Sequence, residues 1–215
     1  STLKENGITY SKNGELVTLE KGKDYEVKDE GTEYASWKKY TYTIYADNFI
    51  GEGSYIVTIH SIDGAENNMT NRSAKTKEYT KKVEFVIDKT APQTVITGVD
   101  NNMQYMESER DVRIDSQDNI ALKEVGVYLN DKGDCAFTWN PDLPTEEREE
   151  FEVNDGMIRY AMKSASHWQN LRVVSVDKAG NRKESDTIRC LLTPNRLVQF
   201  INNRPLFFGT LSFAA

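Results

Sequence analysis

Aspartate is the residue type in this sequence with the clearest capacity for chemistry. Asp63, Asp88 and Asp177 each follow a run of strand-forming residues, and Asp115 and Asp118 stand in similar positions. Hard cations such as Ca²⁺ prefer several oxygen ligands, which carboxylates at strand ends could supply. No loop has the closely spaced acidic pattern of an EF-hand, and such side chains also stabilise turns by accepting backbone hydrogen bonds. We therefore expect either turn carboxylates or a calcium site at Asp63, Asp88 and Asp177.

Other reactive side chains give little support for catalysis. The two histidines, His60 and His167, lie far apart, and two cysteines are too few for a four-thiolate zinc site. The sequence has neither a Gly-x-Ser-x-Gly nucleophile elbow nor a phosphate-binding glycine pattern. The acidic run at 146–150 is typical of a solvated loop or one helical turn, rather than of a paired-carboxylate site. The sequence predicts a protein that is not an enzyme and has no cofactor, calcium excepted.

Cys135 and Cys190 leave two alternatives. Cys190 lies in the last predicted strand, at a position that alternation assigns to the inward face, which favours a buried free thiol. A disulfide between the two would close a loop of about 55 residues and stabilise the fold by about 4 kcal/mol in the chain-entropy model. We favour two free thiols.

Aromatic residues provide the candidates for ligand binding. Trp37 with Tyr40, or Trp139 with Trp168, could form a platform that stacks on a sugar ring. Tryptophan in a β-sandwich more often fills the core. Trp37 and Trp139 are thus candidate binding residues, with a core role as the alternative.

The elements that must position these residues are β-strands. Val, Ile, Thr and Tyr number 57, against 24 for Ala and Leu, and this bias toward β-branched and aromatic residues excludes an all-α fold. The 215 residues suffice for one large domain or two smaller ones. A net charge of -7 speaks against a nucleic-acid partner, which requires a basic surface.

Short strand-like runs separated by turn residues indicate two all-β modules, at 1–90 and 91–194, each with room for about seven strands. Between them, Asp88–Pro92 reads as a short, stiff connector because Pro92 stops the preceding strand and restricts Ala91. The predicted strands are Leu16–Leu19, Tyr25–Lys28, Lys39–Tyr45, Tyr55–Ile62, Lys82–Ile87, Thr94–Val99, Val112–Asp115, Glu124–Leu129, Glu150–Val153, Ile158–Met162, Leu171–Val176 and Thr187–Leu192.

The two modules are copies of one unit. Val57–Asn67 matches Leu171–Asn181, and in both an alternating strand ends in Ser-x-Asp-x-Ala-x-Asn. The Asp and Asn of this string are suited to an Asx-type turn. We expect Asp63 to occupy the place of Asp177, and Cys190 to align with Phe85.

Three strings resemble a known family. They are VEFVIDKTAP at 83–92, SVDKAGN at 175–181 and DNIALKEV at 118–125, and the pattern of 40–67 fits as well. Together they resemble the tandem bacterial immunoglobulin-like repeats of Gram-positive (Firmicutes) cell-surface proteins. The resemblance covers most of residues 15–194. It implies two tandem immunoglobulin-like β-sandwiches at the cell surface, in stalk or adhesion modules that carry no chemistry.

The functional expectation is therefore a non-catalytic spacer or stalk of a larger bacterial surface protein, extracellular and monomeric. The alternative is an adhesion module that binds a glycan or a host protein through an insertion at 131–150, which has no counterpart in the first module. If the insertion is only a binding loop, shortening Asp134–Glu147 to a tight turn should leave the thermal unfolding midpoint nearly unchanged.

The last segment, 195–215, is expected to lie next to a membrane. Pro205–Ala215 has no charged residue but is too short to cross a bilayer, which takes roughly 20 apolar residues. It would form the first half of a transmembrane helix that anchors the full-length protein. The alternative is an amphipathic tail that packs on the second module.

Overall fold

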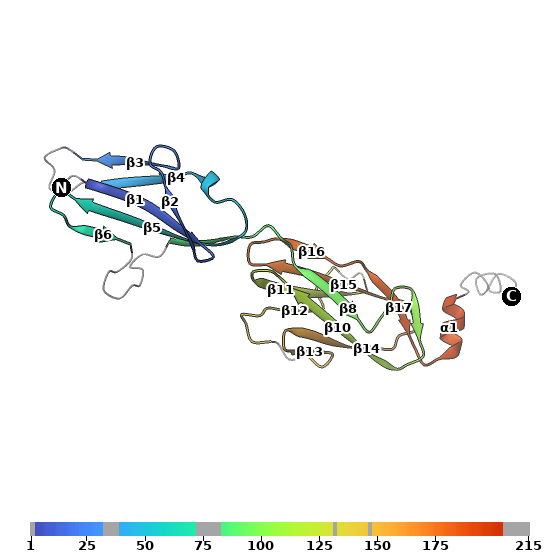
Figure 1. Ribbon diagram of the computed structural model, residues 1–215. Coiled ribbons are helices and arrows are strands. Elements are labelled where there is room, and N and C mark those ends of the chain that lie inside the picture. The colour runs from blue at the N-terminus through green and yellow to red at the C-terminus, as the bar shows by residue number, and fades with distance from the viewer. Residues whose placement is uncertain (1–2, 32–38, 72–82, 131–132, 146–147, 204–215) are drawn as a thin grey trace. The chain divides into compact units, whose positions relative to one another are not determined.

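Two units divide the chain between Lys89 and Thr90, and each is described by itself below as unit 1 and unit 2. The computed structural model describes residues 3–31, 39–71, 83–130, 133–145 and 148–203 (Figure 1). Both units are built from β-strands arranged as immunoglobulin-like sandwiches, so the predicted all-β fold is confirmed.

Unit 1 consists of a five-stranded sheet and a two-stranded sheet. In the larger sheet the order is β2-β1-β5-β6, and β7 pairs with the first half of β5. Its strands are β1 (Leu3–Lys12), β2 (Glu15–Leu19), β5 (Gly53–Asp63), β6 (Asn68–Thr70) and β7 (Val83–Ile87). The smaller sheet pairs β3 (Tyr25–Glu30) with β4 (Lys39–Ile44), and the 3-10 helix η1 (Ala46–Asn48) follows.

The core of unit 1 is small and rich in aromatic rings. Ile8, Leu19, Tyr25 and Val57 form its buried cluster. The ring of fully buried Tyr55 stacks on Phe85, with centroids 5.3 Å apart. Such ring pairs contribute about 1 kcal/mol beyond their buried area. Aromatic side chains thus supply much of the apolar contact that a two-stranded covering sheet can bury.

Unit 2 has two larger sheets. The four-stranded sheet has the order β13-β14-β10-β8, with β8 (Gln93–Thr97), β10 (Glu109–Gln117), β13 (Phe151–Asn154) and β14 (Met157–Lys163). The six-stranded sheet has the order β12-β11-β15-β17-β9, and β16 also pairs with β15. Its strands are β9 (Met103–Tyr105), β11 (Leu122–Leu129), β12 (Phe137–Trp139), β15 (Gln169–Asp177), β16 (Arg182–Glu184) and β17 (Ile188–Leu192). Helix α1 (Arg196–Asn203) follows β17.

The core of unit 2 lies between these two sheets. Alternation along β10 and β14 buries residues such as Val112 and Ile158, and the facing strands β11 and β15 bury Val125 and Leu171. Phe137, Phe151 and Tyr160 stack in series, with neighbouring centroids 4.6 and 4.7 Å apart. Both sheets therefore contribute a continuous apolar layer to one core.

The repeated segments β5 and β15 have the same neighbours in the same register. Asp63 lies opposite Leu3 and Asp177 opposite Leu122, and in both cases the pairing is irregular at the next residue. Two further positions illustrate the match. Ile62 pairs with Asn68 as Val176 does with Arg182. Tyr55 pairs with Phe85 as Gln169 does with Cys190. The predicted repeat is confirmed, and Cys190 occupies the place of Phe85.

The inserted segment of unit 2 is partly core, which corrects one expectation. Phe137 belongs to β12, which pairs with the edge of β11, and its side chain is only 1% exposed. Removing 134–147 would open a cavity beside Phe151 and Tyr160, so the expected neutrality of that deletion toward stability is wrong. The sequence does not reveal this core position, because β12 contributes only three strand residues among turn-forming ones.

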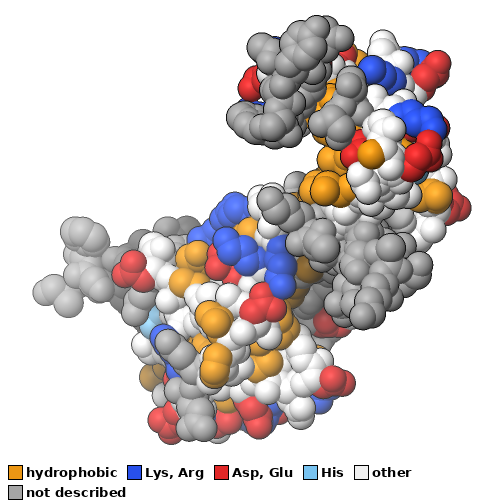
Figure 2. All heavy atoms as spheres, turned by 90° about the vertical axis from the view of Figure 1, so that its left-hand side faces the viewer, with side chains coloured by type: hydrophobic (Ala, Val, Ile, Leu, Met, Phe, Trp, Pro, Cys, Tyr) orange, Lys and Arg blue, Asp and Glu red, His pale blue; other side chains and the backbone are white. Residues whose placement is uncertain are grey.

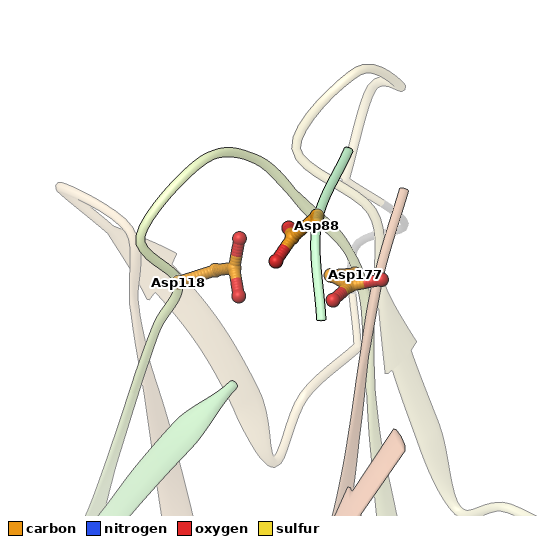
Figure 3. Close-up of side chains that lie close together, drawn as sticks. All are labelled: Asp88, Asp118 and Asp177. Carbon is orange, nitrogen blue, oxygen red and sulfur yellow. The ribbon is translucent and has the colours of Figure 1, made fainter. Parts of the chain in front are cut away.

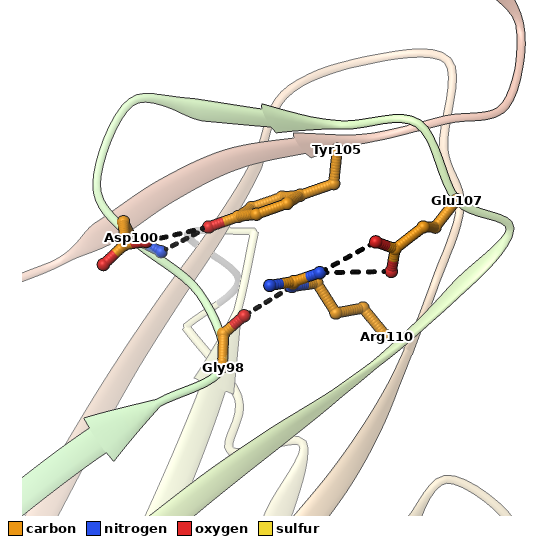
Figure 4. A network of polar contacts seen from close by, with 5 residues as sticks. All are labelled: Gly98, Asp100, Tyr105, Glu107 and Arg110. Atoms are coloured by element: carbon orange, nitrogen blue, oxygen red, sulfur yellow. Dashed lines mark hydrogen bonds and ion pairs between the residues drawn. The ribbon is translucent and has the colours of Figure 1, made fainter.

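A polar network stabilises the turns between β8 and β10 in unit 2 (Figure 4). The Arg110 guanidinium lies 3.9 Å from the centroid of the Tyr105 ring, donates to the Gly98 carbonyl and pairs with Glu107 at 2.9 Å. The Tyr105 hydroxyl accepts a hydrogen bond from the Asp100 backbone N–H at 2.8 Å. These groups satisfy one another, so the network has a structural role.

Candidate functional site

The aspartates at the ends of β5 and β15 build the same turn. Asp177 Oδ1 accepts a hydrogen bond from the Asn181 backbone N–H at 2.8 Å, and its Oδ2 accepts one from the Asn181 side-chain amide at 2.7 Å. In unit 1 both bonds recur between Asp63 and Asn67, each at 2.9 Å. The predicted Asx-type turn is therefore present twice.

The two turns differ in their surroundings. Asp177 is fully buried, whereas Asp63 is partly exposed. Burial alone would raise the pKa of Asp177, but the hydrogen bonds from Asn181, Gly180 and Ala179 outweigh it and hold that pKa below its ordinary value. Asp177 is thus a buried carboxylate that stays ionised because its turn donates to it.

Asp118 lies in the loop that connects β10 to β11, next to the Asp177 turn. Its Oδ2 accepts hydrogen bonds from the backbone N–H groups of Ile120 at 3.0 Å and Ala121 at 2.8 Å. The Ala121 carbonyl in turn accepts a hydrogen bond from the Lys178 N–H at 2.9 Å, which ties the two loops together. Among the described side chains, the other oxygen of Asp118, Oδ1, is the one buried polar atom that has no hydrogen-bond partner.

Asp118 and Asp177 of unit 2 each offer one carboxylate oxygen, and these oxygens lie within 4.8 Å of each other (Figure 3). Carboxylates this close repel one another, and a hard cation with oxygen ligands would relieve the repulsion and give Asp118 Oδ1 a partner. The donor set fits Ca²⁺.

The sequence predicts a calcium site at Asp63, Asp88 and Asp177, with ordinary turn carboxylates as the alternative. Asp177 lies beside Asp118 in unit 2, whereas Asp63 belongs to no group of metal-binding side chains in the described part of the chain. Calcium binding stays a prediction. From the sequence alone, Asp118 is only an aspartate near a strand end. The hydrogen bonds of the intervening turns bring it beside Asp177, and no local sequence pattern could have indicated this.

The inserted segment of unit 2 forms a cleft. A cavity of about 410 Å³ opens there, and its lining includes Glu124, Cys135, Asn140, Leu143 and Arg148. The Cys135 thiol donates a hydrogen bond to the Phe137 carbonyl at 2.9 Å. Among the described residues that line the cleft there is no histidine to pair with this thiol. The cleft can contact a ligand.

The predicted binding residues are placed as follows. Trp139 is partly buried and packs against the core of unit 2, and Trp37 lies outside the described residues. The Trp168 ring is covered by the Arg189 guanidinium, 4.5 Å from the ring centroid. The Tyr40 hydroxyl accepts a hydrogen bond from the Leu3 N–H at 3.1 Å. Sugar stacking on Trp37 or Trp139 stays a prediction.

Both cysteines are free thiols, as favoured from the sequence. Cys190 is fully buried, and burial raises the pKa of its thiol. Its sulfur lies 3.6 Å from that of Met162 in the core. Cys135 is partly exposed. The two thiols should therefore differ in their access to reagents.

Charged side chains of both signs share the surface. Figure 2 shows acidic and basic side chains interspersed with apolar ones on the face that it presents. Some form exposed ion pairs, such as Arg159 with Asp111 and Lys178 with Asp142, each at 2.8 Å. Such pairs contribute at most about 1 kcal/mol each.

No protein-family model and no curated protein sequence matches the chain. Among solved structures, it is similar to the fibronectin(III)-like modules of Clostridium thermocellum CbhA, with 8% identity over 87% of this chain and 77% of that chain and a TM-score of 0.36. It is also similar to extracellular domains 3–5 of Drosophila OTK, with 12% identity over 87% of this chain and 54% of that chain and a TM-score of 0.29. Similarities of this size carry no functional argument.

Proposed function

We propose that the chain is a non-catalytic spacer of a larger bacterial cell-surface protein of the Gram-positive type, in which its two units keep other parts of that protein away from the cell. The carrying observation is the repeat itself. Val57 and Leu171 pack in the cores of the two units, and Asp63 and Asp177 form the same kind of turn. The chain thus duplicates a fold and not a reaction centre, as a spacer requires.

The connector supports a mechanical role. Only five residues, 88–92, separate β7 from β8, and Pro92 fixes its own φ angle. The Lys89 backbone N–H donates to Glu52 Oε1 at 2.8 Å, so the connector is tied to unit 1 at its start. Few backbone angles are left to move freely, which favours a stiff link.

A distance measurement between spin labels on the two units tests this stiffness. The labels go on Leu16→Cys and Val95→Cys, whose native side chains are 71% and 58% exposed, in a Cys135→Ser chain whose buried Cys190 stays unlabelled. A spacer should give one narrow distance distribution, and inserting Gly-Gly-Ser-Gly after Lys89 should broaden it. A distribution as broad in the parent as in the insertion control would overturn the proposal.

The alternative is an adhesion module, and the cleft beside Leu143 is the observation that favours it. A glycan array and a host-protein binding screen separate the two functions. Reproducible binding that Leu143→Ala or Trp139→Ala removes, while Leu16→Ala in unit 1 does not, would replace the spacer by the adhesion module. A spacer gives no binding that depends on these side chains.

A further inference from the structure

The chain enters and leaves unit 2 at opposite ends of its central strand, β15. Near the beginning of β8, the first strand of the unit, the Thr94 hydroxyl forms a hydrogen bond of 2.7 Å with the hydroxyl of Ser175, near the end of β15. In β17, the last strand, Cys190 pairs with Gln169 at the beginning of β15. The strand residues from Gln169 to Ser175 span about 20 Å at about 3.3 Å per residue. A load applied through the chain therefore pulls unit 2 along its strands.

Strands β9 and β17 form the one parallel pair among the described strand pairs of unit 2. Before the pair begins, the Asn102 N–H donates to the Arg189 carbonyl at 2.6 Å. Where the pair ends, the Thr193 N–H donates to the Tyr105 carbonyl at 3.0 Å. The Arg189 N–H also donates to the side-chain oxygen of Asn101 at 3.0 Å. Hydrogen bonds therefore fasten β9 to the last strand at both of its ends.

The direction of these two strands decides how they respond to a load. Strand β9 comes soon after the chain enters unit 2, and β17 comes just before the chain leaves it. Because the two are parallel, tension pulls β9 from its beginning and β17 from its end, so the strands are drawn past each other lengthwise. All bonds across the pair then share the load, whereas a pull across the strands would break them one after another. Forced unfolding is governed by the rate of unfolding, and that rate falls when several bonds must break together.

Side chains of β10 hold β9 from the other sheet. The Arg110 guanidinium of β10 lies over the Tyr105 ring of β9 and donates to the Gly98 carbonyl (Figure 4). The Tyr105 hydroxyl accepts a hydrogen bond from the Asp100 N–H at 2.8 Å. A Cβ added at Gly98 would overlap the Asp111 carbonyl oxygen, so the chain before β9 lies directly against β10. Strand β9 is thus fastened to β17 by its backbone and to β10 by its tyrosine.

The first and last strands of unit 1 are arranged differently. In the described residues, β1 and β7 both lie antiparallel to β5, and Tyr55 of β5 pairs with Lys12 of β1 on one side and Phe85 of β7 on the other. The two strands are therefore separated by β5 and share no ladder of their own. A direct parallel pair between an early strand and the last strand is a feature of unit 2.

We propose that the β9–β17 pair is a mechanical clamp, which keeps unit 2 folded when the chain is under tension. The proposal deepens the proposed spacer function, since it names the part of unit 2 that resists a load. It rests on that function only for the presence of a load on the chain.

Helix α1 provides a point at which to pull on the end of β17. The side-chain oxygen of Asn195 accepts a hydrogen bond from the Leu197 N–H at 2.9 Å, which caps the helix, and the Leu197 side chain is 61% exposed. A load on Leu197, in the first turn, enters β17 directly. The predicted membrane segment at 205–215 lies outside the described residues, and among the described ones no helix is long and apolar enough to cross a bilayer.

Single-molecule force spectroscopy of the full chain tests the clamp by changing the direction of the pull. Handles on Gln93→Cys and Leu197→Cys load unit 2 lengthwise. Handles on Met106→Cys, which follows β9 directly, and Leu197→Cys pull β9 and β17 apart from the same end. All three positions are exposed, and Cys135→Ser with the native, buried Cys190 leaves no other reactive thiol. At one loading rate, the lengthwise pull should need at least about twice the unfolding force of the other pull.

A substitution at the far end of the pair sharpens the test. Asn101→Ala removes the acceptor of the Arg189 N–H and should lower the lengthwise unfolding force by about a third, because one of the bonds that share the load is lost. It should leave the force of the other pull nearly unchanged, since that pull breaks the bonds at the opposite end of the pair first. Asn101→Asp keeps an acceptor oxygen and should restore the lengthwise force. Asn130→Ala removes the same kind of bond, to the Asn170 N–H, outside the clamp, and is the matched control that should leave the lengthwise force in place.

Two outcomes would overturn the proposal. They are a lengthwise unfolding force no greater than that of the other pull, and an Asn101→Ala variant that lowers both forces alike or neither. Protection of the Cys190 thiol from reagents verifies that unit 2 is folded in each variant. Neither outcome alters the spin-label distances between the units, so failure of the clamp and failure of the spacer function are distinguishable.

Discussion

The two units have corresponding central strands, β5 and β15, that end in the same kind of turn, yet their buried cores differ greatly in size. In the described part of the chain, the buried cluster of unit 1 has four members and that of unit 2 has fourteen. The covering sheet explains this, because two strands face β5 in unit 1 whereas four face β15 in unit 2. A repeated strand therefore specifies topology, while the strands around it set stability. We expect unit 1 to unfold at lower denaturant concentration than unit 2.

The largest expected effect concerns a side chain that unit 1 lacks. Phe137→Ala removes a fully buried ring that stacks on Phe151, and such truncations cost about 4 kcal/mol. Urea unfolding followed by the reactivity of buried Cys190 reports on unit 2 alone, because unit 1 has no cysteine. Trp139→Phe is a milder change in the same strand and serves as the control. A loss below about 1 kcal/mol for Phe137→Ala would show that β12 is dispensable.

The next comparison uses the matched pair Val57 and Leu171, which are both buried. Leu171→Ala should destabilise unit 2 by about 3 kcal/mol, and Val57→Ala should destabilise unit 1 by about 2 kcal/mol. Each substitution should move one transition and leave the other in place. Circular dichroism reports both transitions, and the thiol assay identifies the one that belongs to unit 2. If Val57→Ala moved the Cys190 transition as well, the units would not unfold independently.

Much of this organisation could be predicted from the sequence. The string that ends in Asp and Asn indicated both strand register and turn, because its alternation and its Asx chemistry agree. Strand β1 was not predicted, since LKENGITYSK has few apolar residues and gains its place from pairing with β2 and β5. Helix α1 was missed for a related reason, because its apolar positions do not face the core. Asp118 comes close to Asp177 only through the packing of two loops that are far apart in the sequence.

Calcium should stabilise the unit that contains the Asp177 turn, and this stabilisation should not depend on the Asp63 turn. If a cation binds at Asp118 and Asp177, Ca²⁺ at a hundredfold excess over its dissociation constant should stabilise unit 2 by about 2.7 kcal/mol, and chelation should reverse this. Asp118→Asn should abolish the shift. Asp63→Asn, in the corresponding turn of unit 1, should leave it intact. Equal shifts in the parent and in Asp118→Asn would exclude this site.

Acid should also affect unit 2 through Asp177, whose hydrogen bonds hold its pKa below the ordinary value of 3.8. A lowered pKa in the folded state means that the stabilisation is fully present above pH 3.8 and is lost as the pH falls through the lower, folded value. Asp177→Asn should cost about 2 kcal/mol at neutral pH, because it removes charge-assisted hydrogen bonds. Asp177→Asn should also weaken the pH dependence, between pH 5 and 2, of the free energy of unfolding of unit 2, as followed by the reactivity of Cys190. An unchanged pH profile would contradict the role of this carboxylate.

The smallest effect concerns one turn position that the copies fill differently. Gly180 has φ +96° in unit 2, and at the same place in unit 1 Glu66 adopts φ +66°, a conformation that costs a side chain about 1 kcal/mol. Glu66→Gly should therefore stabilise unit 1 by somewhat less than 1 kcal/mol, since the exposed ion pair of Glu66 with Lys4 is lost in exchange.

The reciprocal change, Gly180→Ala, meets no atom within 4 Å, so only backbone strain should destabilise unit 2, by about 1 kcal/mol. Gly98→Ala is the contrasting control, because it has the same φ but places Cβ 2.2 Å from the Asp111 carbonyl oxygen and should cost considerably more. Unfolding midpoints of the three variants, each assigned to its unit by the thiol assay, test the comparison. If Gly180→Ala proved as costly as Gly98→Ala, steric room at the turn would not be what lets unit 1 carry Glu66 there.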